Sequence, residues 1–260
     1  MNNIKQTVYI FWTGGWDSTF RLLQLAEQNI IIKPIYVISE PRPGRKQEQT
    51  AMRKILNLIK VSNKFIAEIK DILIYKQHDI LEKYYDDKII KSSKFCHEKY
   101  NLGEQYGWLA LLAKHLNIKI EMGILFGERS KVDNFFKKEG KLIEFDDNRK
   151  VIDMHNSSEN IINLFSNVIF PIVGYTKKDI LKLSKQKGWY DIMKLTWFCH
   201  TPKFGVPCGR CNPCKDAMNE GMNFRMPLIS KIMYHYYFYT QPLKNKIKIL
   251  LKADKKKVNF

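Results

Sequence analysis

The chain has 260 residues, of which 45% are hydrophobic and 27% charged, the composition of a globular protein that can bury its own core without disulfides. It contains no run of 18 apolar residues and no signal-like N-terminus, so the sequence predicts a cytoplasmic location and no membrane partner. The formal net charge of +18 is compatible with nucleic-acid binding, but also with the lysine-rich usage of an AT-rich coding sequence.

Apolar runs alternate with helical patterns along most of the chain. A buried strand is predicted at residues 8–12, and helical spacing follows it directly. Further strands are predicted at 30–38, 72–75, 118–126 and 168–170, with helices at 47–60 and 102–116. Residues 128–160 are polar and irregular, which predicts a long loop or an excursion. Thr176 and Asp179 then predict the start of a helix that ends at Gly188. This alternation predicts an α/β fold with a mostly parallel, doubly wound sheet.

The segment that links the first strand to the first helix, residues 13–19, reads Thr-Gly-Gly-Trp-Asp-Ser-Thr. Its adjacent glycines, Gly14 and Gly15, let the backbone come close to a bound anion. The amides at the start of the following helix and the hydroxyls of Ser18 and Thr19 are donors for such an anion. The segment lacks the lysine of the common nucleotide-binding loop, and a plain connecting turn is the alternative.

Four of the five cysteines crowd into residues 199–214, and Cys96 stands alone. Four thiolates at this spacing predict one structural, tetrahedral zinc ion per chain. An iron–sulfur cluster and redox-active thiols are the alternatives. The predicted metal ligands are Cys199, Cys208, Cys211 and Cys214.

The linking segment resembles the Ser-Gly-Gly-x-Asp-Ser signature of the PP-loop ATP pyrophosphatases, with Thr13 in place of the first serine. This resemblance implies that the loop holds the pyrophosphate of ATP while a substrate oxygen attacks the α-phosphorus, and Mg²⁺ is expected to bridge the phosphates. It also implies catalytic roles for Asp17 and Ser18. The ATP-binding residues that it implies are Trp12, Thr13, Gly14, Gly15, Trp16, Asp17, Ser18 and Thr19, with Lys177 added by the next segment.

Two later segments are similar to the 7-cyano-7-deazaguanine synthases of that superfamily. Residues 171–180 match their Pro-x-x-Gly-x-[Ser/Thr]-Lys-x-[Asp/Glu]-Ile segment. Residues 195–199 and 207–214 look like their Leu-Thr-Trp-Ser-Cys and Cys-Gly-x-Cys-x-x-Cys segments. Lys177 occupies the family's lysine position, where it would neutralise charge on the leaving pyrophosphate, although a solvated helix lysine is the alternative. The resemblance extends over roughly residues 7–222.

The resemblance implies an ATP-dependent carbon–nitrogen ligase of queuosine biosynthesis. Enzymes of this family adenylate 7-carboxy-7-deazaguanine, form an amide with ammonia and dehydrate the amide to the nitrile. Three segments depart from the family pattern, and they leave the identity of the acid open. These departures are at residues 39–41, 99–101 and 127–131.

Other functions therefore stay open. A diverged paralogue could pass the activated deazaguanine to a macromolecular acceptor, for example in defence. A PP-loop enzyme that transfers sulfur to tRNA and a zinc-stabilised nucleic-acid-binding module without enzymatic activity are further alternatives. A partner protein and a homodimer are left open as well.

Three segments follow from these motifs. Residues 1–190 are predicted to form the ATP-binding α/β domain, and residues 191–222 a small zinc-binding subdomain. Residues 223–260 are predicted to form a basic, aromatic C-terminal extension with a helical tail.

Overall fold

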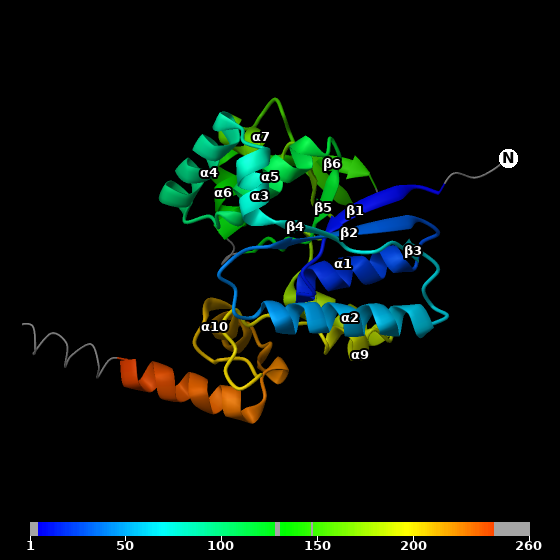
Figure 1. The fold of residues 1–260 in the computed structure, drawn as a ribbon, viewed down its shortest axis with the longest axis vertical. Helices are drawn as coiled ribbons and strands as arrows, with labels where there is room; N and C mark the ends of the chain where they lie inside the picture. Colours follow the sequence, from blue (N-terminus) through cyan, green and yellow to red (C-terminus); the bar gives the residue numbers. More distant parts are fainter. Residues whose placement is uncertain (1–4, 128–130, 147, 242–260) are drawn as a thin grey trace, which may run out of the picture. The chain divides into compact units, whose positions relative to one another are not determined.

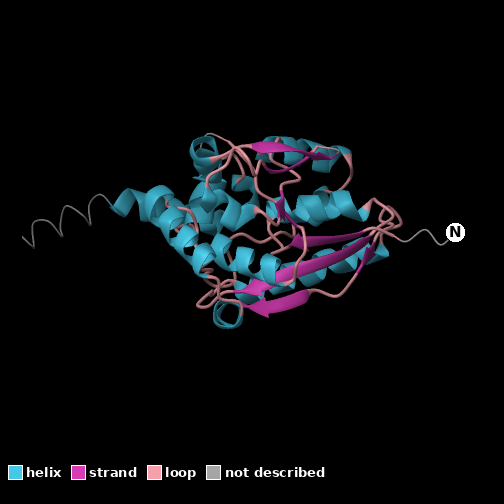
Figure 2. Cartoon of the chain, turned by 90° about the horizontal axis from the view of Figure 1, so that it is seen from above, coloured by secondary structure: helices cyan, strands magenta, loops and turns pink. Residues whose placement is uncertain are grey.

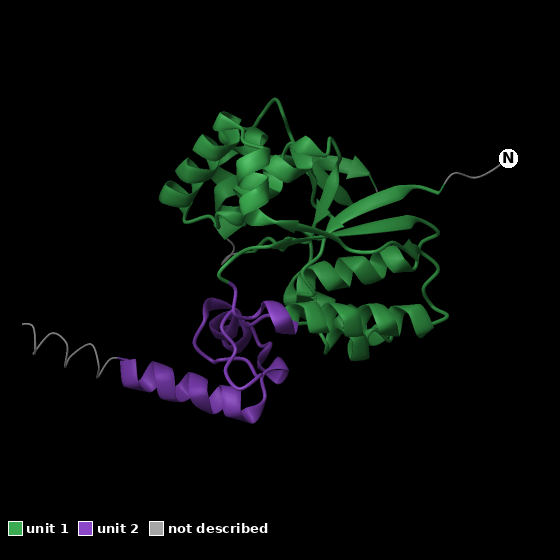
Figure 3. Ribbon diagram, in the orientation of Figure 1, with its two compact units in different colours: residues 1–41, 48–197 green, residues 42–47, 198–260 purple. Residues whose placement is uncertain are grey.

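The computed structural model describes residues 5–127, 131–146 and 148–241. The chain divides into two compact units (Figure 3). Unit 1 contains residues 1–41 and 48–197, and unit 2 contains residues 42–47 and 198–260. The three-part division expected from the sequence stays a prediction, and the lysine-rich end of the chain lies outside the described residues.

Unit 1 is built on one sheet in which every described strand pair is parallel. The strand order is β3-β2-β1-β5-β8, and β4 also pairs with β2 (Figure 1). The predicted doubly wound α/β fold is thereby confirmed. The strands are β1 (Thr7–Phe11), β2 (Ile31–Ile38), β3 (Glu68–Ile69), β4 (Leu73–Lys76), β5 (Ile120–Met122) and β8 (Val168–Ile169).

Helices cover both faces of this sheet (Figures 1 and 2). On one face lie α1 (Trp16–Ala26), α2 (Arg45–Val61), α8 (Lys177–Gln186) and α9 (Tyr190–Met193). The other face carries α3 (Gln77–Lys83), α4 (Asp87–Tyr100) and α5 (Gln105–His115). Residues 106–113 of α5 are all buried, because an apolar helix between a sheet and further helices has no solvent face.

The polar region of unit 1 is more regular than expected. Of the two alternatives predicted for 128–160, the long loop is wrong, because the described residues form a helix, a hairpin and the start of another helix. Helix α6 buries Val132, Phe135 and Phe136, which follow helical spacing among charged neighbours. The elements are α6 (Lys131–Glu139), the antiparallel pair β6 (Leu142–Asp146) and β7 (Arg149–Ile152), and α7 (Glu159–Phe165).

A buried charge network joins α1, β5 and the hairpin of unit 1. Glu121 lies in β5 with 1% of its surface exposed. Arg21 donates to both of its carboxylate oxygens, at 2.6 and 2.8 Å, and Arg149 donates to it at 2.9 Å. Arg149 also pairs with Asp146, so two positive and two negative groups balance one another. Buried charges are tolerated when they are paired in this way.

Replacing Glu121 with alanine is expected to destabilise the protein by about 3–5 kcal/mol, because Arg21 and Arg149 would lose a buried counter-charge. Urea unfolding measures the change in the free energy of unfolding. Glu98→Ala is the control, since Glu98 and Lys94 form an exposed pair at 4.0 Å and the variant should unfold like the parent. An unfolding free energy of Glu121→Ala equal to that of the control would contradict the expectation.

Unit 2 contains α10 (Asn212–Asn219), a short 3₁₀ helix at Asn223–Arg225 and a helix over residues 228–241. The last helix packs against Gly209, where a Cβ would come within 2.6 Å of the Ser230 carbonyl oxygen and 2.7 Å of the Tyr234 nitrogen. Gly209 also has a φ of +73°, so glycine is required there on two grounds. None of the described helices has both the length and the hydropathy to cross a bilayer.

Candidate functional site

The predicted phosphate loop lies at the point where the order of the strands along the sheet reverses. From β1 the chain moves to β2 on one side, and it later returns through β5 on the other side of β1. In open α/β sheets, ligands bind beyond the carboxyl ends of the strands at such a switch point. The loop begins where β1 ends, so the fold places it at the expected ligand-binding position.

Two glycines shape this loop. Gly14 has a φ of +67°, and its carbonyl oxygen accepts a hydrogen bond from the Trp197 amide at 2.9 Å. A Cβ on Gly14 would lie 2.7 Å from the Met52 Cγ atom, so both backbone angle and space favour glycine. Gly15 is the N-cap of α1 and has no side chain that could cap the helix. The first turn of α1 is thus available to a ligand that accepts hydrogen bonds.

Ser18 supports an anion site in this turn. Its Oγ atom is buried and has no hydrogen-bond partner within the part of the chain that the structure describes. Buried hydroxyls in proteins are nearly always paired, so this one suits a bound acceptor such as a phosphate oxygen. Asp17 is half-buried in the same turn. Catalytic roles for Asp17 and Ser18 stay predictions.

Other predicted loop residues support the site from within the core. Trp12 and Thr19 are both 0% exposed, and the indole nitrogen of Trp12 donates to the Thr19 hydroxyl at 3.0 Å. Trp16 is also buried, whereas Thr13 is exposed. A direct role for these four residues in binding ATP stays a prediction.

Gly123, which follows β5, is a residue of the candidate site that was not predicted from the sequence. A Cβ on Gly123 would lie 3.0 Å from the Ser18 Cα atom, 3.1 Å from the Ser18 nitrogen and 3.2 Å from the Asp17 carbonyl carbon. These are backbone atoms, which cannot move aside as a flexible side chain can. The available signal was a glycine inside the strand predicted at 118–126, which often marks a close backbone approach.

The later family-like segments of unit 1 contact the same helix and loop. The Tyr175 ring packs edge-on against Phe20 of α1, with centroids 5.5 Å apart. The Trp197 amide donates a hydrogen bond to the Gly14 carbonyl oxygen, as described above. These contacts bring together residues that are 155 and 183 positions apart in the sequence.

Lys177 is the first residue of α8, a helix that contacts α1. The expected capping box is confirmed: the Thr176 hydroxyl accepts from the Asp179 amide at 3.2 Å, and the Asp179 carboxylate accepts from the Thr176 amide at 2.9 Å. The Thr176 donors hold the pKa of Asp179 below its usual value. As predicted, Gly188 marks the end of this helix: α8 ends at Gln186, Lys187 is its C-cap, and Gly188 follows with a φ of +70°. Contact between Lys177 and a phosphate stays a prediction.

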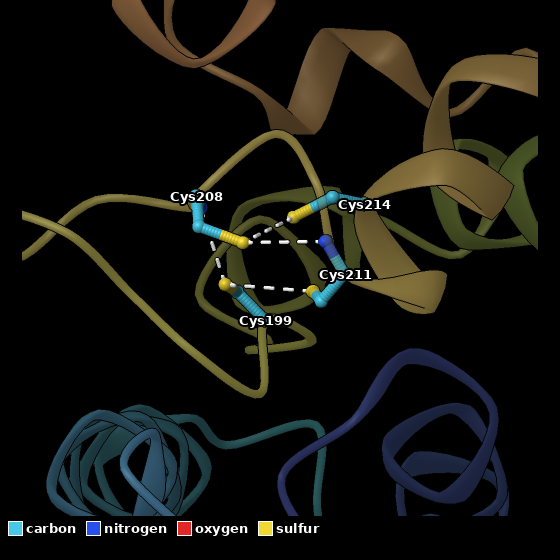
Figure 4. A group of neighbouring side chains, drawn as sticks. All are labelled: Cys199, Cys208, Cys211 and Cys214. Atoms are coloured by element: carbon cyan, nitrogen blue, oxygen red, sulfur yellow. Dashed lines mark hydrogen bonds between the residues drawn. The ribbon is translucent and has the colours of Figure 1, made fainter. Parts of the chain in front are cut away.

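The four predicted cysteine ligands come together in unit 2 (Figure 4). Their sulfurs all lie within 4.8 Å of one another, with 3.8 Å between Cys199 and Cys211 and 4.0 Å between Cys208 and Cys214. A zinc ion about 2.3 Å from each of four sulfurs separates them by about 3.8 Å in a tetrahedron. The cluster therefore fits a single tetrahedral ion, whereas an iron–sulfur cluster, with several irons between the sulfurs, would need a wider cage.

The hydrogen bonds and the pKa shifts of the four thiols also agree with a metal site. The Cys208 amide donates to the Cys199 sulfur at 3.2 Å, and the Cys211 amide donates to the Cys208 sulfur at 3.4 Å. Hydrogen bonding with Cys199 and Cys214 lowers the pKa of Cys211, whereas contact with the other thiols raises the pKa of Cys214. A divalent cation would hold all four as thiolates together.

Among the segments that depart from the family pattern, the one residue that fits has a structural role. Asn101, the one residue of 99–101 that fits the family, ends α4 with a φ of +53°, and its amide donates to the His97 carbonyl oxygen at 2.9 Å. Asparagine is one of the few residues that adopt this angle readily. Three residues of the departure at 127–131 lie outside the described residues.

The α/β sheet, the loop at its switch point and the four-cysteine cluster agree with the resemblance of the sequence to the PP-loop ATP pyrophosphatases. A family model described as queuosine biosynthesis protein QueC matches residues 141–222, which include the segment at 171–180 and all four clustered cysteines. The resemblance found in the sequence is thus confirmed over these residues, where the chain is QueC-like. Together these findings support an ATP-dependent enzyme without fixing its substrate.

Two solved structures resemble the chain with low sequence identity and low TM-scores. A 4-thiouridine synthetase, crystallised with RNA and bound ATP, is 15% identical, with a TM-score of 0.39 over 88% of this chain and 53% of that one. The chain therefore spans about half of that protein. A predicted subunit of tRNA methyltransferase from Methanocaldococcus jannaschii is 15% identical, with a TM-score of 0.36 over 69% of this chain and 74% of that one. A comparison with curated proteins finds no significant match.

Proposed function

We propose that the protein uses ATP to adenylate the carboxylate of a 7-deazaguanine and passes the activated acyl group to ammonia. The observation that carries this proposal is the loop at the switch point, where the buried, unpaired Ser18 hydroxyl lies in the first turn of an α1 helix that has no side-chain cap. The QueC match at residues 141–222 supports the deazaguanine as the acid.

In the proposed reaction, a carboxylate oxygen attacks the α-phosphorus of ATP and pyrophosphate leaves. Ammonia then attacks the acyl carbon, AMP departs with the former carboxylate oxygen, and the amide forms. A second ATP adenylates the amide oxygen, whose loss as AMP with two protons gives the nitrile. Mg²⁺ would screen the phosphate charges in both rounds.

The residues of this chain supply binding and charge stabilisation in that scheme. The first turn of α1 and the Ser18 hydroxyl would hold the pyrophosphate. Lys177, at the start of α8, would neutralise charge as it grows on the leaving group. Asp17 would act beside the phosphates, where a carboxylate suits the binding of Mg²⁺.

We propose that Cys199, Cys208, Cys211 and Cys214 hold a structural zinc ion, one per chain. A site closed by four thiolates leaves no position for substrate, so the ion would stabilise unit 2 rather than take part in the chemistry.

A sulfur-transfer reaction is less well supported. Four cysteines belong to the metal cluster, and the remaining one, Cys96, is 0% exposed. Burial raises the pKa of the Cys96 thiol to about 12, so the nucleophilic thiolate is scarce near neutral pH. A sulfur carrier requires an accessible thiol of lower pKa.

The test is release of pyrophosphate and AMP by the zinc-loaded protein with Mg-ATP and 7-carboxy-7-deazaguanine, with and without ammonia. We expect acid-dependent release and amide or nitrile by mass spectrometry. Ser18→Ala, which removes the buried hydroxyl, should turn over more slowly by about tenfold or more. Turnover without an ammonia product would favour the diverged paralogue with another acceptor. No ATP binding and no turnover would refute the proposal.

A further inference from the structure

The positive charge of the protein is concentrated in unit 2. About a quarter of the chain holds fifteen of the 44 basic residues and three of the 26 acidic ones, and so carries +12 of the net +18. Four thiolates around a divalent ion would add −2, which leaves the unit strongly positive. Such a charge favours an anionic partner and disfavours a second copy of the same unit.

Phe204 lies at the tip of a tight turn between the first two cysteine ligands. Lys203 and Val206 exchange two backbone hydrogen bonds of 3.0 Å, with Phe204 at a φ of +51° and Gly205 at +77°. Turns of this kind favour asparagine or glycine at both central positions, and a bulky residue there is an outlier. The Phe204 side chain is 96% exposed, so burial within the chain does not offset the strain.

More aromatic surface lies on the helix at 228–241. The side of this helix that carries Ser230 and Tyr234 packs against Gly209. Tyr236 and Tyr239 project from the opposite side and are 67% and 77% exposed, beside the exposed aliphatic residues Leu228 and Ile232. The described part of unit 2, residues 42–47 and 198–241, therefore exposes aromatic rings and holds eight basic residues against two acidic ones.

From this combination we infer that unit 2 binds single-stranded nucleic acid, with Phe204 stacking on a base and nearby cations contacting the phosphates. Single strands are bound by just these two elements, a positive surface and aromatic rings that stack on exposed bases. Lys203 adjoins Phe204, and Arg210 lies in the same cysteine-rich segment, which contains no acidic residue between 198 and 215. A duplex, whose bases are already stacked, offers Phe204 no partner.

The test uses the zinc-loaded, full-length protein and fluorescence anisotropy with labelled 20-nucleotide oligo(U), oligo(dT) and a duplex of the same length. We expect the single strands to bind more tightly than the duplex. The slope of log affinity against log salt should be about −2 to −4, the value for roughly three to six neutralised phosphates. The ratio of oligo(U) to oligo(dT) affinity shows which nucleic acid is preferred.

Two variants separate stacking from charge. Phe204→Asn keeps a residue that tolerates the left-handed turn, so it should fold and hold zinc, yet bind single strands roughly 10- to 100-fold more weakly with an unchanged salt slope. Lys203→Gln should reduce the slope by about 0.7. Tyr85→Ala, at a 64% exposed aromatic residue in unit 1, is the matched control and should bind like the parent.

Several outcomes would overturn the inference. They are the absence of binding at low salt, equal binding of single strands and duplex, and a Phe204→Asn variant that binds like the parent. The last result would leave Phe204 as an anchor for a protein partner. None of these outcomes depends on ATP turnover, so they are distinguishable from failure of the proposed enzymatic function.

Discussion

Replacing Cys208 with serine is expected to release the bound metal and to unfold the cysteine-rich segment of unit 2. The Cys199, Cys208 and Cys214 side chains are at most 2% exposed, yet the segment around them contains few large apolar residues. Structural zinc contributes about 10–16 kcal/mol of apparent binding free energy in small zinc-folded units, which rivals the stability of a whole domain of about 5–15 kcal/mol. Loss of one ligand should therefore unfold the segment.

Elemental analysis and limited proteolysis measure this effect. The parent should contain one zinc ion per chain and resist cleavage in residues 198–222, whereas Cys208→Ser should lose most of its zinc and be cleaved there. Cys96→Ser is the matched control, because Cys96 is equally buried but lies outside the cluster. A Cys208→Ser protein with full zinc content and unchanged resistance would show that the cluster is not a four-cysteine zinc site.

Local sequence signals were sufficient for the phosphate loop of unit 1 and, separately, for the cysteine cluster of unit 2. The strand, the paired glycines and the helix that follows occur together in residues 7–26, so the loop could be predicted from a single short window. The cysteine cluster is similarly local, because its four ligands fall within residues 199–214 and surround a turn that requires Gly209. In both cases the geometry is set by neighbours in the chain.

Elements whose buried side contains few apolar residues were not predicted from the sequence. Helix α4 buries only Ile89, Ser92 and Cys96, so its core-facing side is partly polar and its hydrophobic period is weak. The strand expected at 118–126 is only Ile120–Met122, because the chain departs from the sheet at Gly123. Glu121, in the middle of that strand, is buried by partners 100 and 28 residues away. A prediction from a short stretch of sequence cannot include partners so far away in the chain.

The contribution of Gly123 to the site also depends on distant partners. Its neighbours, Asp17 and Ser18, lie about 105 residues earlier in the chain. The strand order brings them together, because β5 pairs directly with β1 and both strands end at the switch point. The phosphate loop is thus shaped by its own glycines and by one glycine from the adjacent strand.

Gly123→Ala is expected to impair ATP binding and turnover. The added methyl group would lie 3.0–3.2 Å from backbone atoms of Asp17 and Ser18, closer than nine in ten Cβ contacts in proteins. The first turn of α1 would have to shift by a few tenths of an ångström, and with it the amides and the hydroxyl that we propose hold the pyrophosphate. Misplacement of a reacting group by about 1 Å costs about 100-fold in rate. We therefore expect ATP affinity to fall about tenfold and turnover by about 10- to 100-fold.

The matched control for this prediction is Gly103→Ala, where a Cβ would meet only side-chain atoms at 3.6 Å or beyond. ATP affinity is measured by calorimetry and turnover by pyrophosphate release, with urea unfolding as a check on the fold. Overpacking costs about 1–3 kcal/mol, so Gly123→Ala should remain folded while it loses ATP binding. If this variant binds ATP as tightly as Gly103→Ala does, then Gly123 supports only the packing of α1 on the sheet, and the phosphate site does not depend on the position of its first turn.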